Sequence, residues 1–568
     1  MDKQHYITEF IARRHDIEEK TRDFIDKMET KFFDGSIDRV MPEAEASKAE
    51  PAVDGERLLL TESTDSPKVR EVELKDTTLE VLKRLLDYIY SSKLSLVHMK
   101  EELVIEVLGL ANKYGFVDLV EAIVDHLKSI IHNSNLCNIF NISLQCVLTS
   151  LTDFCLEYAD RNAELVLRSE GFLQLSENAV QQLISRDSFC AKEIDIFQAV
   201  GEWIKANSLE NGQKLLNEVR LPLISLRDLL GSIRPTKLLS PDAILDAIQE
   251  QQQTKSAHLM HRAVIVPNVN IVTTSRGAQV ITGEFKHADV MQYKGERGHT
   301  QHLITQEPAD KEPGIVIELG KLYMINKIVM SLYERNANCW YSYFIELSMD
   351  NKNWLRVVDY REFLCRGQQN LYFERRPARF IRIVGTNCTT HNYFALTDFE
   401  ALYTTEIMTF DSETKILIPD DNVATIKDDA LVIDGVSKSR NALINGDTLG
   451  YDWNKGYTCH KIGCGSIVIQ LPQPYIISTM RLLLWDCDSR SYSYHIDVSA
   501  NKKDWKTVVD KTGEACQSWQ HLKFEPVPVV FVRIVGTHNT VNEVFHCVHF
   551  ECPSSPLPAL IDEEQDAA

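Results

Sequence analysis

The sequence predicts a multidomain protein in which a helical region is followed by two tandem antiparallel β-sandwiches. From Leu74 to about Ile248, apolar residues recur three and four positions apart, a spacing that is typical of amphipathic helices. After about residue 262, β-branched and aromatic residues alternate with polar ones between Gly, Asn and Asp, which is typical of strands. The β half then repeats itself at a distance too long for a small structural unit. Each copy is therefore a whole domain.

Composition limits the class of protein. A chain of 568 residues has room for three to five domains. Its formal net charge of −21 repels phosphate groups, so we expect no nucleic-acid partner. We find no apolar run near 18 residues, so we expect no membrane span. The 13 cysteines form no C-x-x-C pair, and the first residues form no apolar leader, so we expect free thiols and a cytoplasmic location.

The N-terminal part divides into a charged segment and a series of helices. Residues 1–57 are charged and are expected to be partly helical or disordered. Apolar spacing then predicts helices over 79–89, 103–111 and 119–127, the second of them ending at Gly115 in a left-handed conformation. Further along, Phe189, Phe197 and Trp203 are expected in the core, and 221–223, which is Leu-Pro-Leu, is expected to separate two helices.

The β half consists of two copies of one module. GIVIELGKLYMI from Gly314 matches SIVIQLPQPYII from Ser466, and FIRIVGTN from Phe380 matches FVRIVGTH from Phe531. The offset changes from 152 to 151 residues across the loop at 333–339, which is one residue longer in the first copy. Several short strands separated by turn residues predict a sandwich or jelly roll.

The residues that the two copies share are expected to build the fold. Trp354 and Trp505 are expected to fill equivalent core positions. Arg382 and Arg533 lie in otherwise apolar strands, and we expect internal carboxylates to hold them. The carboxylates considered are Glu400 and Glu551.

The repeated segments resemble the discoidin-like domain, also called the coagulation factor 5/8 C-terminal type. The resemblance rests on LLWDCDSRSYSY from Leu483, then IDVS, then DW, then FVRIVGT. It implies an antiparallel jelly-roll sandwich with ligand loops projecting from one end. Secreted members usually carry a terminal disulfide, but no cysteine lies near Lys415 to pair with Cys552, which fits an intracellular version.

The helical region resembles two other families. LKDTTLEVLKRLLDYIYSSKLSL from Leu74 is similar to the C-terminal half of a BTB/POZ domain, and DRNAELVLRSEGFLQLSENAVQQL from Asp160 is similar to a BACK domain. The expected domains are a partial BTB/POZ domain at 58–130, BACK at 131–255, discoidin-like domains at 263–405 and 411–553, and an acidic disordered tail at 554–568.

The BTB resemblance implies cullin-3 and a second copy of this chain as partners. In such proteins, helical segments like 137–155 contact the cullin. However, the front of a BTB domain, with its D-V-x-F-x-V strand, H-[KR]-x-V-L run and φ-x-E loop, is not recognisable here, and Leu58–Leu60 is the only trace of it. Both partners therefore stay open.

The candidate ligand site is the loop set of the second sandwich. The sequence Asn-Gly-Asp is typical of a turn. Aromatic residues near it can anchor a partner, and neighbouring loops add polar groups. Alternatively, the two tryptophans cover the end of the sandwich and the arginine pairs internally with an Asp. The first copy differs at matching positions, so the second is expected to dominate binding. The candidates are Asn445, Asp447, Tyr451, Trp453, Trp485, Asp486, Arg490, His538 and Asn539.

No motif for catalysis, a cofactor or a metal is found. His546 and His549 would face opposite sides of a strand, and Asp486 with Asp488 offers too few ligands for calcium. The sequence therefore predicts a non-enzymatic adaptor that joins a cullin-3 ubiquitin ligase to an unknown protein client. The alternative is a cytoplasmic scaffold that binds a protein or glycan without a ligase role.

Overall fold

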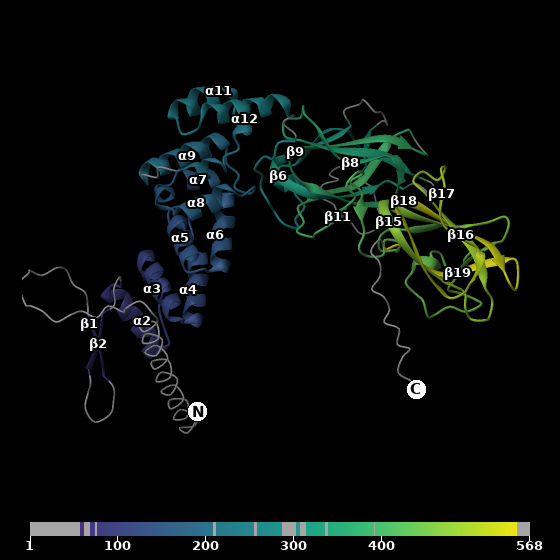
Figure 1. The fold of residues 1–568 in the computed structure, drawn as a ribbon, viewed down its shortest axis with the longest axis horizontal. Coiled ribbons are helices and arrows are strands. Elements are labelled where there is room, and N and C mark those ends of the chain that lie inside the picture. Colours follow the sequence, from purple (N-terminus) through teal and green to yellow (C-terminus); the bar gives the residue numbers. More distant parts are fainter. Residues whose placement is uncertain are drawn as a thin grey trace, which may run out of the picture. The chain divides into compact units, whose positions relative to one another are not determined.

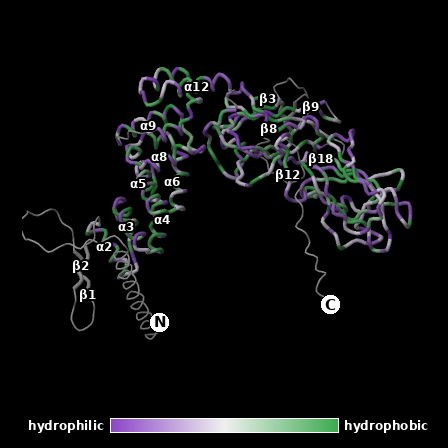
Figure 2. Tube along the Cα trace, in the orientation of Figure 1, coloured by the Kyte–Doolittle hydropathy of each residue, from purple (hydrophilic) through white to green (hydrophobic). Residues whose placement is uncertain are grey.

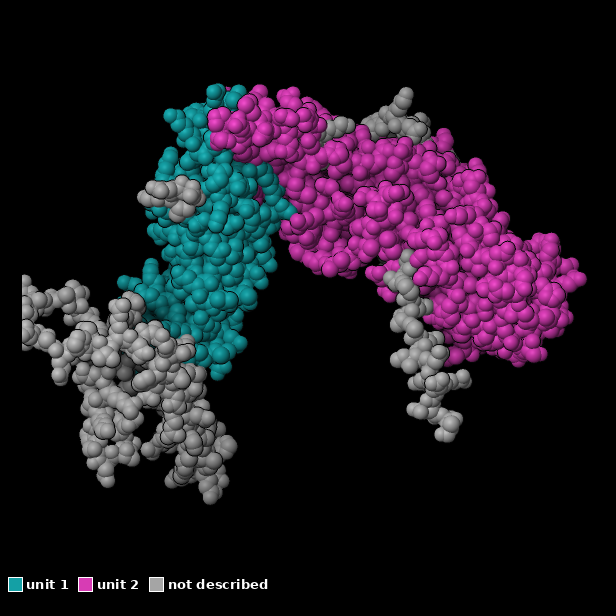
Figure 3. Space-filling view, in the orientation of Figure 1, with its two compact units in different colours: residues 1–220, 230–239 teal, residues 221–229, 240–568 magenta. Residues whose placement is uncertain are grey.

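The protein forms two compact units, which Figure 3 shows in different colours. The helical unit comprises residues 1–220 and 230–239, and the sandwich unit comprises 221–229 and 240–568. A computed structural model describes residues 57–61, 69–73, 77–207, 212–254, 258–286, 303–306, 314–334, 339–390 and 392–553. The sequence expectations for 1–56 and for the tail at 554–568 lie outside the described residues.

The helical unit begins with a short hairpin and three helices. Strands β1 (Arg57–Thr61) and β2 (Val69–Glu73) pair in antiparallel fashion, so Leu58–Leu60 lies within a strand. Helices α2 (Leu79–Ser91), α3 (Glu101–Tyr114) and α4 (Val117–Ile130) follow and bury most of the predicted apolar positions. Leu79, at the start of α2, is exposed. Gly115 has a φ of 76° after α3, as the sequence predicts.

The rest of the helical unit is a series of short helices, drawn from blue to teal in Figure 1. Hydrophobic and hydrophilic residues are interleaved along them (Figure 2), as expected for helices with one packed face. Phe189, Phe197 and Trp203 are buried, which confirms them as core, and the Trp203 indole donates to the Leu175 carbonyl over 2.9 Å. The elements are α5 (Leu136–Gln145), α6 (Thr149–Arg161), α7 (Ala163–Leu167), η1 (Glu170–Gln174), α8 (Glu177–Ile184), α9 (Glu193–Ala206), α10 (Gln213–Leu216) and η4 (Arg234–Thr236).

The sandwich unit opens with helical turns. The predicted helix break at 221–223 is a single 3₁₀ turn, η2 (Leu221–Leu223), followed by α11 (Leu226–Asp228). A π-helical turn, η3 (Leu229–Ile233), comes next in the chain, and α12 (Pro241–Gln253) lies further on. The Gln251 amide of α12 donates to the Pro222 carbonyl over 2.9 Å.

The two β-sandwiches share one strand order apart from the extra edge strand β4 of the first, which confirms the predicted repeat. In the first, hydrogen-bonded strands follow the order β4-β5-β10-β6-β9-β7-β8, and in the second β14-β19-β15-β18-β16-β17. All the strand pairings in these sheets are antiparallel, and β6, β7, β8 and β9 have the same lengths as β15, β16, β17 and β18. The first sandwich has β3 (Gln279–Thr282), β4 (Glu284–Lys286), β5 (Leu303–Gln306), β6 (Ile315–Leu332), β7 (Tyr341–Ser348), β8 (Leu355–Cys365), β9 (Gln368–Cys388) and β10 (Phe394–Leu402). After β11 (Thr409–Phe410) and β12 (Leu417–Ile418), the second has β13 (Leu431–Asp434), η7 (Ala442–Ile444), β14 (Thr458–Lys461), β15 (Ile467–Leu484), β16 (Tyr492–Ser499), β17 (Lys506–Cys516), β18 (Trp519–Asn539) and β19 (Val544–Glu551).

Long strands serve both faces of each sandwich. The register of β6 with β9 shifts between Glu318 and Tyr323, and that of β15 with β18 shifts between Gln470 and Tyr475. Such a break lets one strand bend and take part in two layers. Each pair of layers encloses its own cluster of buried apolar side chains.

The partners expected for the two repeated arginines, Arg382 and Arg533, are wrong. Arg382 binds Glu346, and the Arg533 guanidinium donates to Asp497 over 2.7 Å. The reason is register, because each carboxylate lies directly opposite its arginine on the adjacent strand. Glu551 instead pairs with Arg481.

The expectation for the two repeated tryptophans is also corrected. Trp354 and Trp505 do occupy equivalent positions, but both are only half-buried. Each indole lies 4.2 Å from the guanidinium of Arg382 or Arg533, so it covers an ion pair at the sheet surface.

The glycine of the repeated Val-Gly-Thr sequence is required for steric reasons in both copies. A Cβ added at Gly536 would lie 2.3 Å from the Phe545 side chain, and one added at Gly385 would lie 2.2 Å from Phe394. The ring of the neighbouring strand occupies that space in both copies. The glycine is therefore required by close packing.

Candidate functional site

The candidate loops of the second sandwich meet at one end, as the resemblance implies. One loop joins β15 to β16 and contains Trp485 and Arg490, and the turn at 517–518 joins β17 to β18. Hydrogen bonds link the two, because Gln517 donates to the Asp488 carbonyl over 3.0 Å and Ser518 donates to the Asp486 carboxylate. The segment at 441–457 joins them through ring contacts with Trp485. We call this region the loop end.

Trp485 is the centre of the loop end. Its side chain is completely buried, and its ring packs against Tyr451, Trp453 and Tyr457 at centroid distances of 5.8, 4.5 and 5.4 Å. Trp453 lies above it and is 53% exposed. Trp485 is thus a supporting residue, and Trp453 offers the ring that a ligand can reach.

Arg490 is held inside the protein. It is 3% exposed, it binds Asp488 through two contacts of 2.7 Å, and its guanidinium lies 4.7 Å from the Trp453 ring. The Arg490 hydrogen bond lowers the pKa of Asp488. Arg490 therefore pairs internally with an aspartate, which is the alternative that the sequence left open.

Asp486 is also occupied by neighbours. Tyr451 donates its hydroxyl to one Asp486 oxygen over 2.6 Å, and Ser518 donates to the other. Burial and the Asp486 hydrogen bond raise the pKa of Tyr451, so the hydroxyl stays protonated. This pair ties the Trp453 segment to the β15–β16 loop.

Asn445 and Asp447 shape their own loop. Asn445 accepts the Asp447 N–H over 2.9 Å, and Asp447 accepts the N–H groups of Leu449 and Gly450. The tip of this loop is Leu449, which is 93% exposed. Leu449 is not among the residues expected from the sequence, although a lone leucine between turn residues is a signal of an exposed loop tip.

The last two candidates differ from each other. Asn539 is 7% exposed and donates to Asn542 and to the Val544 carbonyl, which makes it a structural residue of the β18–β19 turn. His538 is exposed, and Val541 at the tip of the turn is 61% exposed. Asn445 is exposed too. We call five of the exposed side chains of the loop end the loop-end surface, namely Asp447, Leu449, Trp453, His538 and Val541.

At the corresponding end of the first sandwich, described residues contact the second sandwich. The Trp340 indole donates to Gln470 over 2.9 Å, packs edge-on against Phe531 at 5.8 Å, and lies under the Lys502 ammonium at 4.9 Å. Trp340 directly precedes β7, at the position equivalent to the residue after Arg490. The end that is free in the second copy is thus an internal contact in the first.

Backbone and amide groups complete this contact. The N–H groups of Leu364 and Arg366 donate to the carbonyls of Ala500 and Pro472 over 3.2 and 3.0 Å. Gln369, completely buried, donates to the same Pro472 carbonyl over 3.0 Å. Buried polar groups matched in this way fix the docking of the two copies.

The fold and the loop end define a BTB–BACK protein that carries two discoidin-like binding modules. The BTB/POZ domain model matches residues 56–131, and the BACK (BTB And C-terminal Kelch) model matches 136–234. The F5/8 type C domain model matches twice, at 295–398 and 433–550. Within the described residues, no helix is long and apolar enough to cross a membrane.

The chain belongs to the family of BTB/POZ domain-containing protein 9. It is 48% identical to the Homo sapiens protein over 493 residues, which covers 86% of this chain and 80% of that protein. It is 45% identical to the Drosophila melanogaster protein over 504 residues, covering 88% and 69%. Kelch-like protein 3 of Mus musculus is 25% identical over 284 residues, covering 47% of each chain.

Solved structures similar to part of the chain include a CBM32 of AlyQ in complex with 4,5-unsaturated mannuronic acid. It has 12% identity and a TM-score of 0.18, and the match covers 22% of this chain and 96% of that one. CpGH89CBM32-6 produced by Clostridium perfringens has 18% identity and a TM-score of 0.19, covering 24% and 100%.

Proposed function

We propose that the chain is a non-enzymatic adaptor that binds a protein client through the loop-end surface of its second sandwich. The observation that carries this proposal is the difference between the two copies. The first uses its loop end to hold the second, through Trp340 and Gln369, whereas the second presents Trp453 and Leu449 to solvent. Among the described residues, the loop end that is open to an outside ligand is that of the second copy, so we expect the second copy to dominate binding.

Trp453 has the properties of an interface anchor. It is half-exposed, yet Trp485 supports one part of its ring and the Arg490 guanidinium lies 4.7 Å away. A tryptophan held in place by its neighbours loses little conformational freedom on binding, and tryptophan is enriched among interface residues that carry most of the binding energy. Asp447 and His538 add polar groups at the rim. This combination suits a protein surface, and a glycan is the alternative ligand.

The helical unit is the proposed site for a second partner. The resemblance to BTB–BACK proteins implies cullin-3 binding and homodimer formation. Helices α5 and α6 form the segment that we expect to contact the cullin. If cullin-3 is recruited, the assembled ligase ubiquitinates the client and this chain contributes no catalytic group. A scaffold without a ligase role is the competing function, favoured by the unrecognisable front half of the BTB domain. We propose a cytoplasmic location and the domain limits expected from the sequence.

Proximity labelling with the full chain tests the client-binding function. Trp453→Ala combined with Leu449→Ala should lose a set of labelled proteins that the parent chain labels. The matched control is Ile407→Ala, which removes a side chain that is 92% exposed outside the loop end and should keep that set. Identical labelling by the loop-end variant and the parent would overturn the loop-end proposal. Loss of labelling only after deglycosylation of the extract would favour the glycan.

Recruitment of cullin-3 needs a separate measurement. Purified full chain mixed with purified cullin-3 should co-elute in size-exclusion chromatography, and light scattering on the chain alone reports whether it dimerises. Failure to co-elute, together with a strict monomer, would leave the scaffold function standing.

A further inference from the structure

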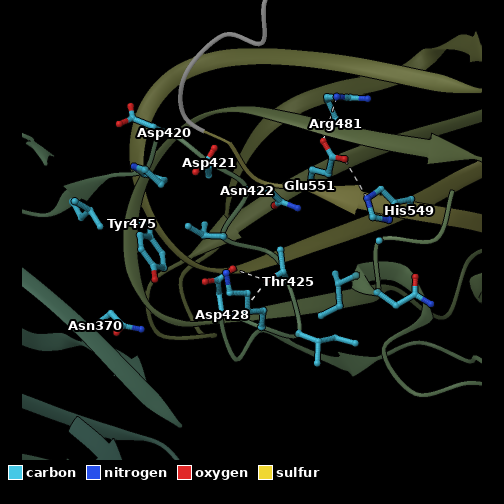
Figure 4. A pocket seen from close by; sticks show the side chains of 18 of the residues that line it. Asn370, Asp420, Asp421, Asn422, Thr425, Asp428, Tyr475, Arg481, His549 and Glu551 are labelled. Carbon is cyan, nitrogen blue, oxygen red and sulfur yellow. Dashed lines mark hydrogen bonds and ion pairs between the residues drawn. The ribbon is translucent and has the colours of Figure 1, made fainter. Parts of the chain in front are cut away.

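A large cleft lies at the junction of the two sandwiches, and its volume is about 1140 Å³. Asn370 of the first sandwich lies on one side, and Asp421, Asp428 and Tyr475 of the second lie on the other (Figure 4). Tyr372 of the first sandwich also lines the cleft. Neither sandwich holds this cleft alone. It is larger than a typical small-molecule pocket, so it has room for an extended chain.

Reciprocal hydrogen bonds fix the two sides of the cleft relative to each other. The Asn370 N–H donates to the Gln473 side-chain oxygen over 2.7 Å, and the Gln473 amide donates back to the Asn370 carbonyl over 2.8 Å. Gln473 is 1% exposed, so this pair is shielded from water. The cleft is therefore preformed, which lowers the cost of ordering it around a ligand.

The charges in the cleft are unequal. The acidic lining residues are Asp420, Asp421, Asp428 and Glu551, and the lysine and arginine residues are Lys327, Lys427 and Arg481, with His549 beside them. Arg481 pairs with Glu551 at 3.4 Å, and Lys327 lies 4.6 Å from the Tyr372 ring and 4.0 Å from Glu406. In contrast, neither Asp421 nor Asp428 has a basic partner within 4 Å among the described residues.

Tyr475 gives a second and independent indication of a ligand. Its side chain is 5% exposed, and among the described residues its hydroxyl makes no hydrogen bond. In Figure 4 the hydroxyl points toward the space between Asn370 and Asp428. The ring is buried but the hydroxyl oxygen is open to the cleft, so a ligand there can form the hydrogen bond that the described residues do not supply.

We propose that the cleft binds an extended basic peptide segment of a partner protein. Lysine or arginine side chains of the peptide pair with Asp421 and Asp428, and a peptide N–H or carbonyl bonds the Tyr475 hydroxyl. The aliphatic stems of such side chains pack on the apolar part of the lining, which includes Val423 and Ile426. The cleft borders the loop end, because Asn445, Gly446 and Thr448 line it, but Asp421, Asp428 and Tyr475 are not part of the loop-end surface. Binding in the cleft therefore goes beyond the proposed function.

Fluorescence anisotropy with the full chain tests this site, using labelled octalysine, octaglutamate and a Gly-Ser octapeptide at physiological salt. Octalysine should bind, and the other two peptides should not. Asp421→Asn with Asp428→Asn should weaken octalysine binding about tenfold. The matched control, Asp504→Asn with Asp510→Asn, removes two exposed carboxylates of the same sandwich and should change it less than about twofold.

Two single variants sharpen the test. Tyr475→Phe deletes only the hydroxyl and should weaken octalysine binding about threefold. Trp453→Ala should leave octalysine binding unchanged, so a failure of the loop-end proposal is distinguished from a failure of this one. Equal weakening by the cleft and control double variants, an unchanged affinity for Tyr475→Phe, or loss of binding in Trp453→Ala would each overturn the proposal.

Discussion

The indole N–H of Trp340 in the first sandwich donates a hydrogen bond of 2.9 Å to the side-chain oxygen of Gln470 in the second. Gln470 is completely buried, and its own amide donates to the Leu364 carbonyl of the first sandwich over 3.4 Å. The two copies are thus docked head to tail. The contact gives the first copy the role of a support and leaves the second copy with the free loop end.

Trp340→Ala should loosen this docking without unfolding either sandwich. Truncating a central interface tryptophan typically costs about 2 kcal/mol or more. The amide protons of Leu364 and Arg366, which bond to the second sandwich, should then exchange at least about tenfold faster by mass spectrometry. The control is Trp354→Ala, which removes a tryptophan that stacks on Arg382 within the first sandwich. Equal protection of these amides in Trp340→Ala and the parent would contradict the docking role.

Two variants at the loop end should distinguish a residue that supports the fold, Trp485, from a residue that is open to a ligand, Trp453. The variants are Trp485→Ala and Trp453→Ala. Trp485 is completely buried, so its truncation should destabilise the second sandwich by about 3–5 kcal/mol. Trp453 is 53% exposed, so its truncation should cost only about 1 kcal/mol, from the lost stacking on Trp485. Calorimetry of the full chain measures both. A larger loss in Trp453→Ala than in Trp485→Ala would mean that the roles are reversed.

The architecture could be predicted from the sequence, because most residues that the two copies share are ones that build the fold. Gly385 and Gly536 are an example, since a phenylalanine on the next strand demands each of them. The partners of Arg382 and Arg533 were missed because they depend on cross-strand register, which alignment of the copies alone does not give. Glu346 and Asp497 occupy equivalent positions, so that register was the missing step.

The candidate site was predicted less completely, and the reason is burial. Trp453 and Trp485 look alike in sequence, but one is half-exposed and the other is completely buried. Arg490 reads as a free cation until Asp488 is seen beside it. The contact of Trp340 with Gln470 could not be predicted from the repeat, because it joins the two copies and the repeat describes each copy by itself.

His546 should make the second sandwich sensitive to acid. Burial, with the nearby Arg490 charge, lowers the pKa of His546 to about 4 from its ordinary value of 6.5. Between these two values the unfolded chain binds a proton that the folded chain does not. The stabilisation is therefore complete above about pH 6.5 and is lost as the pH falls toward 4, by up to about 3 kcal/mol. Urea unfolding across this range should show a smaller loss for His546→Gln. An equal pH dependence in variant and parent would refute the assignment.

Val147→Gly should stabilise the helical unit and weaken its proposed partner contact. Val147 follows α5 with a φ of 55°, and the Leu148 and Val147 N–H groups donate to the Ser143 and Leu144 carbonyls. This is the C-terminal arrangement in which glycine is favoured, and a β-branched residue is strained there. Glycine should relieve about 1 kcal/mol, measured as a higher unfolding temperature of the helical unit.

The second readout for Val147→Gly is binding to cullin-3. Val147 is 78% exposed in the segment expected to contact the cullin, so a valine in this strained position is explained if its side chain meets a partner. The variant should therefore be more stable and bind purified cullin-3 more weakly. Leu165→Ala, which truncates a side chain that is 53% exposed outside that segment, is the control and should bind as the parent does. A stabilised Val147→Gly protein with unchanged cullin-3 affinity would show that this residue is not part of the interface.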